Sequence, residues 1–183
     1  MLKATIVTTR EEIEQINRLN KLNYRKNVSP EERDKEGFVS WEYPVELLQQ
    51  LQDSAPHVIV KDDEKVVAYA LVAMKEAALF HRDLQAMFDH LYPIGYKGKL
   101  LATYNFYCMG QVCIDKDYRG KGVFGMLYQH HKKLYQDSFD MLITEISVSN
   151  IRSQRAHEKV GFKTIYSYTD EMDEWNVVAW DWR

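Results

Sequence analysis

The segment with the clearest chemical signature runs from Asp117 to Gly125 and reads DYRGKGVFG. It follows a hydrophobic run, Gln111–Ile114, and precedes an amphipathic stretch, so it lies at a predicted strand-to-helix junction. Glycine has no Cβ, which permits positive φ and lets the backbone approach a ligand closely. Backbone N–H groups at a helix N-terminus bind anions, most often phosphates. The segment therefore predicts a phosphate-binding turn, with Arg119 and Lys121 as further partners.

Two common phosphate motifs do not account for this turn. A Walker A loop needs a glycine five residues before Gly120-Lys121 and a Ser or Thr after the lysine, and the sequence has neither. The glycines at 120, 122 and 125 do have the GxGxxG spacing of dinucleotide-binding proteins, but the surrounding pattern is not a repeating βαβ unit. Taken alone, the turn is as compatible with a structural role as with a binding role.

A second motif lies about thirty residues further on, where Asn150–Phe162 reads NIRSQRAHEKVGF. It places an amide at a predicted strand end, begins a helix near Ser153 and ends it at Gly161, a common residue after a helix C-terminus. Ser153 and His157 are one helical turn apart, so their side chains share a face. We therefore expect Asn150 and His157 to converge on one ligand.

Hydrophobic periodicity predicts the elements that position these motifs. Thr9 and Glu12 form a capping-box pattern at the start of the first helix. Helices are expected over 10–24, 44–52, 120–139 and 153–160, with a helical face between 79 and 91. Strands are expected over 3–8, 57–61, 65–75, 102–114, 141–148, 162–169 and 175–182. Loops are expected over 26–40 and 93–98.

Composition limits the function classes. The chain has 183 residues and a formal net charge of −3, so a broad nucleic-acid interface is not expected. Its two cysteines, Cys108 and Cys113, lack the spacing of a disulfide framework or a zinc site, so no metal is expected and a reducing cytoplasm is the predicted compartment. The N-terminal segment lacks the pattern of a signal peptide, and no apolar run is long enough to span a membrane.

The two motifs together resemble the GNAT superfamily of acyl-CoA-dependent N-acyltransferases. The family's pyrophosphate-binding motif is Gln/Arg-x-x-Gly-x-Gly/Ala, which Arg119 and Gly122 match, and a downstream pattern of Asn…Ser/Ala…Tyr…Gly-Phe is matched by Asn150, Ser153 and Gly161-Phe162. The chain departs from the family at Phe124, where Gly or Ala is usual, and at His157, where Tyr is commonest.

The resemblance covers essentially the whole chain and implies a fold and a cofactor. The fold is of the mixed α/β (α+β) class, with a central, twisted, mostly antiparallel sheet of about six to seven strands flanked by helices. A splayed strand pair would hold acetyl-CoA, the acyl donor. Residues 1–183 would form a single domain with an insertion at about 76–104. The implied cofactor-binding residues are Val112, Cys113, Ile114, Arg119, Gly120, Lys121, Gly122, Val123, Phe124, Gly125, Asn150 and Ser153.

The resemblance also implies a reaction, the direct attack of a primary amine on the thioester through a tetrahedral intermediate. A backbone N–H near Cys113 or Ile114 would polarise the carbonyl, and His157 would be the general acid for the departing thiolate. The strand before the turn has no carboxylate at Tyr107, Cys108 or Gln111, so Glu145 on the adjacent strand is our candidate base, with bound water as the alternative.

The acceptor is expected to be a small-molecule or peptide amine. A catalytically silent acyl-CoA-binding or sensing domain is the alternative, favoured by Phe124 and by the missing carboxylate. A third reading is an interaction module that uses the insertion and the many tyrosines. The sequence leaves open whether the C-terminal strands form a homodimer interface or pack their tryptophans inward.

Overall fold

The computed structural model describes residues 1–183, apart from the side chain of Asp34. A seven-stranded sheet with the order β1-β2-β3-β6-β7-β9-β8 forms its centre. The strands are β1 (Leu2–Ile6), β2 (Val58–Asp62), β3 (Lys65–Ala73), β6 (Phe106–Ile114), β7 (Met141–Ser147), β8 (Lys163–Thr169) and β9 (Glu174–Asp181). The helices are α1 (Arg10–Asn23), α2 (Pro30–Glu36), α3 (Val45–Ser54), α4 (Arg82–Leu91), α5 (Val123–Tyr135) and α6 (Ile151–Val160). This architecture confirms the predicted fold class.

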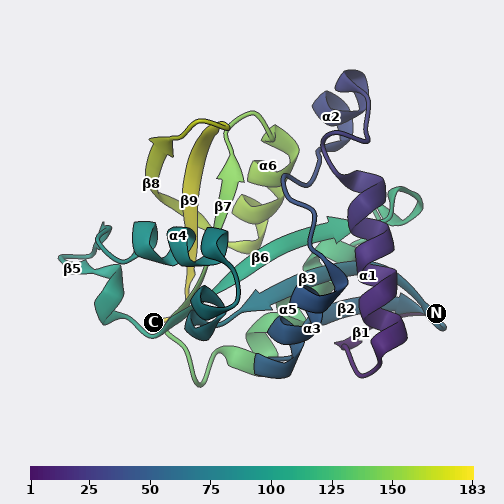
Figure 1. Cartoon of the computed structure of the whole chain (residues 1–183), viewed down its shortest axis with the longest axis horizontal. Helices are drawn as coiled ribbons and strands as arrows, with labels where there is room; N and C mark the ends of the chain where they lie inside the picture. Colours follow the sequence, from purple (N-terminus) through teal and green to yellow (C-terminus); the bar gives the residue numbers. More distant parts are fainter.

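The sheet divides into two parts at its centre. Among the described strands of this sheet, β6 and β7 form the one parallel pair, and they pair only from Phe106 with Met141 to Cys108 with Ile143. Beyond that point β6 continues along β3, whereas β7 continues along β9. Figure 1 shows the result: β6 crosses the view beside β3, and β7 turns upward with β8 and β9. The predicted splayed strand pair is therefore present.

Helices cover both faces of the sheet. On one face, α1 and α3 pack through Ile13, Ile16 and Leu48, which are fully buried. On the other face, α5 packs through Leu127 and Tyr128, which are also fully buried. In Figure 1, α1 and α3 lie in front of the sheet and α5 behind it. Alternating side chains of β6 enter the two cores in turn, as expected for a sheet buried on both faces.

Several local predictions are confirmed. The capping box at the start of α1 is formed by Thr9 and Glu12, each bonding the backbone of the other. The strands expected over 57–61 and 65–75 are present as β2 and β3, which form an antiparallel hairpin with Asp63 at positive φ in its turn. Helix α5 begins at Val123, three residues later than expected, because Gly120 and Gly122 adopt positive φ and end the turn before it.

Two segments differ from expectation. Residues 26–40, expected to be a loop, contain α2; Ser29 caps this helix and Pro30 occupies its first turn, a signal in favour of a helix start. The strand expected from 102 begins at Phe106, after a 3₁₀ helix, η2 (Leu101–Thr103). The region before it holds the 3₁₀ helix η1 (Lys75–Leu79), α4, and a small hairpin of β4 (Gly95–Tyr96) and β5 (Lys99–Leu100). Within the part of the chain that the structure describes, no helix is long and apolar enough to cross a membrane.

Candidate active site

The divergence of β6 and β7 has a visible local cause. In the pairing of β3 with β6, Ala70 lies opposite Val112 and Val72 lies opposite Met109. Two residues of β6 therefore face a single residue of β3 between these pairs, so β6 carries a β-bulge. A bulge bends its strand and increases the local twist. The Thr144 hydroxyl of β7 donates to the Met109 carbonyl at 2.9 Å and forms the last bond between the two strands. The gap therefore opens at a fixed point.

A groove of about 720 Å³ lies beyond this point, between the end of β6, the turn before α5, and α6. All of the predicted cofactor-binding residues except Lys121 line it: Val112, Cys113, Ile114, Arg119, Gly120, Gly122, Val123, Phe124, Gly125, Asn150 and Ser153. The ammonium group of Lys121 lies over the ring of Tyr118, at 5.1 Å. The structure thus brings the two sequence motifs together on one concave surface.

The turn before α5 presents free backbone donors to this groove. Gly120 and Gly122 have φ of 75° and 77°, and Gly122 caps α5 without any side-chain bond to the helix. The first N–H groups of a helix have no partner within the helix. Together with the helix dipole, they suit an anion.

The charge of the groove also suits an anion. Five cationic side chains line it, those of Lys35, Arg119, Arg152, Arg155 and Lys159, against a single carboxylate, Glu36. The net charge of the whole chain is −3, so this basic surface is local. Arg152, Arg155 and Lys159 were not among the predicted site residues. Their spacing of three and four residues places them on one side of α6 and was the available signal.

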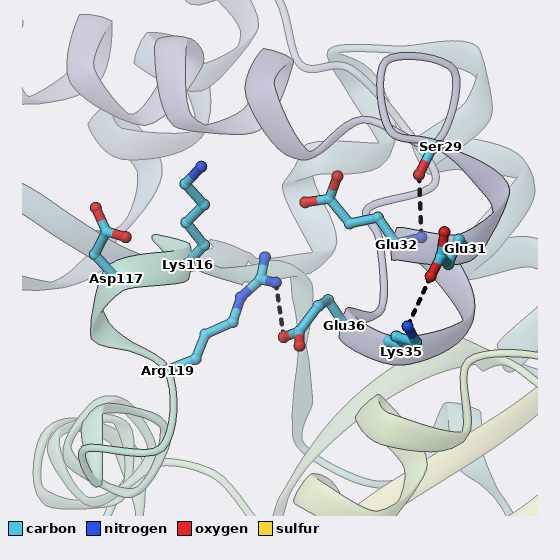
Figure 2. Close-up of a pocket in the computed structure, with 8 residues that line it drawn as sticks. All are labelled: Ser29, Glu31, Glu32, Lys35, Glu36, Lys116, Asp117 and Arg119. Carbon is cyan, nitrogen blue, oxygen red and sulfur yellow. Dashed lines mark hydrogen bonds and ion pairs between the residues drawn. The ribbon is translucent and has the colours of Figure 1, made fainter.

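Arg119 lines the groove but is held by protein groups. Its Nε donates to the Ile114 carbonyl at 3.2 Å, and its two terminal nitrogens donate to Asn23 Oδ1 at 2.7 Å and to Glu36 Oε2 at 3.1 Å. Its side chain is only 13% exposed. Figure 2 shows the guanidinium directed toward Glu36 on α2. In this conformation Arg119 ties the turn to α1 and α2.

Asn150 also has a local structural role. Its Oδ1 accepts from the Ser153 N–H at 3.2 Å and so caps α6, and its Nδ2 donates to the Phe38 carbonyl at 3.1 Å. The amide therefore links α6 to the chain that follows α2.

His157 lies in the core, away from the groove, with 1% of its surface exposed. Its Nδ1 lies 2.8 Å from the Ser153 carbonyl, which can only accept, so Nδ1 carries the proton. Its Nε2 then accepts from the Tyr128 hydroxyl at 2.6 Å. Burial lowers the pKa of His157 to about 4. The structure does not bring Asn150 and His157 onto one ligand, because this face of α6 packs against α5.

The ring of Phe124 packs against the buried side chains of His157 and Tyr128. It meets His157 edge-on, with centroids 5.0 Å apart, and leans on Tyr128 at 4.8 Å. The groove persists with this ring on its side, so an aromatic residue at this position does not close it.

Glu145 lies on β7, one residue beyond the bond that ends the β6–β7 contact. Burial raises its pKa to about 7, and the neighbouring Tyr168 hydroxyl opposes this rise. Its Oε1 is buried and has no hydrogen-bond partner among the described residues. A carboxyl group with these properties exchanges a proton near neutral pH. It does not line the groove; with Ile143, it projects from the face of β7 opposite to that of Thr144.

The two cysteines are free and buried. Burial raises the pKa of Cys113 to about 12 and that of Cys108 well above its ordinary value. A thiol that stays protonated is a poor nucleophile, so Cys108 serves as a core residue. Among the described residues, no group of three or more His, Cys, Asp or Glu side chains is placed to hold a metal ion.

The sequence comparison identifies the family to which this fold belongs. Residues 13–162 match the acetyltransferase (GNAT) family, and the chain belongs to that family. No curated protein matches the sequence at a significant level.

Similar solved structures support the fold at low sequence identity. The ribosomal-protein-S18-alanine N-acetyltransferase of Escherichia coli shares 13% identity with a TM-score of 0.62, over 99% of this chain and 94% of that one. Ard1 from Thermoplasma volcanium shares 14% with a TM-score of 0.66, over 97% of both chains. A chain of the NatC complex bound to Gag peptide and CoA shares 12% with a TM-score of 0.65, over 98% of both.

Proposed function

We propose that this protein is an N-acyltransferase that moves an acetyl group from acetyl-CoA to a primary amine of a small molecule or a peptide. The groove at the divergence of β6 and β7 carries this proposal, since it combines free N–H groups at the start of α5 with five cationic side chains. A cofactor with several phosphates needs both. Family membership and the CoA-bound structural relative support the same donor.

The chain supplies binding groups for the donor on either side of the gap. The N-terminus of α5 and the basic residues of α6 would hold its phosphates. The edge of β6 beyond the bulge, which β7 no longer covers, would hold its extended arm through main-chain bonds. A backbone N–H of this edge would stabilise the developing oxyanion, a contribution of about 3 kcal/mol in comparable sites.

Glu145 would accept the proton that the amine loses. The amine nitrogen forms a bond to the thioester carbonyl carbon, the carbon–sulfur bond then breaks, and the amine proton passes to the Glu145 carboxylate directly or through water. The sulfur leaves as a thiolate. A cysteine-like thiol has an ordinary pKa near 8.5, so the thiolate can leave without a fixed proton donor. The buried position of His157 argues against the acid role that the resemblance implied.

The test combines binding with turnover. Acetyl-CoA is titrated by calorimetry, and thiol release is then followed with a panel of amines between pH 6 and 9. Glu145→Gln is expected to lower kcat by about a hundredfold or more while leaving acetyl-CoA affinity unchanged. Glu174→Gln, an exposed carboxylate on the neighbouring strand β9, is the matched control and should retain activity.

The alternative, a silent acyl-CoA-binding domain, predicts a different result. It requires tight acetyl-CoA binding and no thiol release above the uncatalysed rate with any amine. The mostly buried Glu145, with a pKa of about 7 beside the strand divergence, favours the enzyme. Equal rates for wild type and Glu145→Gln would rule out this base and leave water in its place.

A further inference from the structure

The segment of residues 26–38, called here the α2 flap, leaves the fold and returns at almost the same place. The Arg25 N–H donates to the Val39 carbonyl at 2.9 Å, and the Val39 N–H donates to the Asn23 carbonyl at 3.0 Å. These bonds close the base of the flap, and Val39 anchors it with 5% exposure. In Figure 1 the flap stands at the end of α1, beside α6. Within the flap, Asn27 Nδ2 also donates to the Lys21 carbonyl of α1 at 2.7 Å, so this end of the flap stays fixed to α1.

Polar contacts, rather than core packing, hold α2 in place. None of the described side chains of this helix is buried. A cavity of about 600 Å³ separates it from Lys116 and Asp117 on one side (Figure 2), and the groove lies on the other. A helix without an apolar face in the core depends on its few side-chain bonds for its position.

Glu36 makes the decisive bonds. Its Oε2 accepts from Arg119 at 3.1 Å and from Arg152 at 2.6 Å. Arg119 belongs to the turn before α5, and Arg152 belongs to the first turn of α6, so the carboxylate joins two separate sides of the groove. Arg152 also donates to the Lys35 carbonyl at 3.3 Å. All three charged side chains line the groove that would receive the phosphates.

Guanidinium groups bind carboxylates and phosphates with the same donors. The phosphates of CoA together carry more negative charge than the Glu36 carboxylate and would compete with it for the same N–H groups. Of the other cations of the groove, Lys35 pairs with Glu31, whereas Arg155 and Lys159 have no ion-pair partner among the described residues. An arriving polyphosphate would meet these first and then Arg119 and Arg152.

We propose that Glu36 is an internal competitor for the cofactor phosphates, which keeps the α2 flap bound across the groove until those phosphates take Arg119 and Arg152 and release it. This inference rests on the proposed use of acyl-CoA. It adds Arg152 to the phosphate-binding residues and gives the flap a defined trigger.

Gly37 supplies the hinge that this movement requires. It has φ of 75°, which favours glycine, and an added Cβ would lie 2.9 Å from Asn150 Oδ1. The next residue, Phe38, accepts a bond from Asn150 through its carbonyl. The flap thus pivots beside the residue that caps α6, directly after Glu36.

The test measures acetyl-CoA affinity and hydrogen exchange of residues 26–38 in the wild type and in two variants. Glu36→Gln keeps the shape and removes the charge that bridges the arginines. Glu32→Gln removes the same charge from the same helix, where the Glu32 side chain neither lines the groove nor forms an ion pair with any described residue. We expect Glu36→Gln to lower the Kd for acetyl-CoA roughly threefold to tenfold and to speed flap exchange without ligand. Glu32→Gln should leave the Kd unchanged.

Acetyl-CoA itself should speed flap exchange in the wild type to the level of Glu36→Gln. Slower exchange on binding would show a lid that closes over the cofactor and would overturn the proposal. Weaker binding of acetyl-CoA by Glu36→Gln would also overturn it. Equal tightening by Glu32→Gln would overturn it too, because the effect would then reflect general charge. If neither the wild type nor Glu36→Gln binds acetyl-CoA, the proposed function is wrong as well. If both bind it and Glu36→Gln changes neither the Kd nor the flap exchange, only the flap mechanism is wrong.

Discussion

The two sides of the groove are built on different principles. Helices α5 and α6 form a packed side, in which Leu127, Tyr128 and His157 are buried together against the sheet. The α2 flap forms the opposite side and is held by charged groups at the surface. Burial of a large apolar side chain contributes about 1.5–3 kcal/mol, whereas an exposed ion pair contributes about 0–1 kcal/mol. The difference predicts a fixed side that binds and a movable side that regulates access.

The packed side should be the more sensitive to acid, and this is the largest effect we expect. Burial lowers the pKa of His131 on α5 to about 3 and that of His157 on α6 to about 4, below the ordinary value of 6.5. The unfolded chain therefore binds these protons first, so stability is complete above pH 6.5 and falls as the pH drops toward 4. At pH 5 the loss is about 2 kcal/mol per histidine.

Urea unfolding between pH 7 and 5 measures this loss. His157→Gln should remove about 2 kcal/mol of the pH dependence while lowering the stability at pH 7. The carboxylates with lowered pKa, such as Glu12 and Asp115, lose their contribution only at lower pH, because their unfolded pKa is near 4. The buried His57, whose pKa is lowered to about 4, adds to this loss, whereas the raised pKa of Glu145 opposes it. A pH dependence that His157→Gln leaves unchanged would contradict the buried, neutral state of His157.

These buried histidines also show what a sequence leaves open. Helical spacing correctly places Ser153 and His157 on one face of α6, but it does not reveal which neighbour that face meets. The answer depends on Tyr128, a residue 29 positions away in the sequence. Similarly, Glu36 reaches Arg119 across 83 positions, and no local pattern contains that pair. Hydrophobic periodicity found most of the elements and the glycine turn, because those follow from nearby residues.

The functional residues also differ in how far the local sequence predicts them. The glycines before α5 were predictable, since positive φ and backbone donors are local requirements. The position of Glu145 one residue past the strand divergence depends on a bulge in β6, and its raised pKa depends on burial by several elements. A candidate base could be named from the sequence, but its environment required the fold.

A large-to-small substitution on the packed side should give the next largest effect. Leu127 is fully buried between α5 and the sheet. Leu127→Ala leaves a cavity and should lower the free energy of unfolding by about 2–5 kcal/mol. Urea denaturation at pH 7 measures this change. Leu134 on the same helix is 40% exposed, so Leu134→Ala is the control and should cost well under half as much. Equal costs would mean that α5 does not anchor this side of the groove.

The smallest effect should come from the flap, and it should be confined there. The Ser29 hydroxyl accepts from the Glu32 N–H at 3.2 Å and caps α2. Ser29→Ala removes a cap worth about 1 kcal/mol to the helix. Because α2 is not packed into the core, global unfolding should change by less than about 0.5 kcal/mol, while the amides of residues 31–36 should exchange roughly fivefold faster. Thr9→Ala, which removes the corresponding cap of the packed helix α1, should instead lower global stability by about 1 kcal/mol. If Ser29→Ala lowered global stability as much as Thr9→Ala, the flap would be an integral part of the fold. Releasing it would then cost more free energy than breaking the two ion pairs of Glu36, and cofactor phosphates could not release it by competing for Arg119 and Arg152 alone.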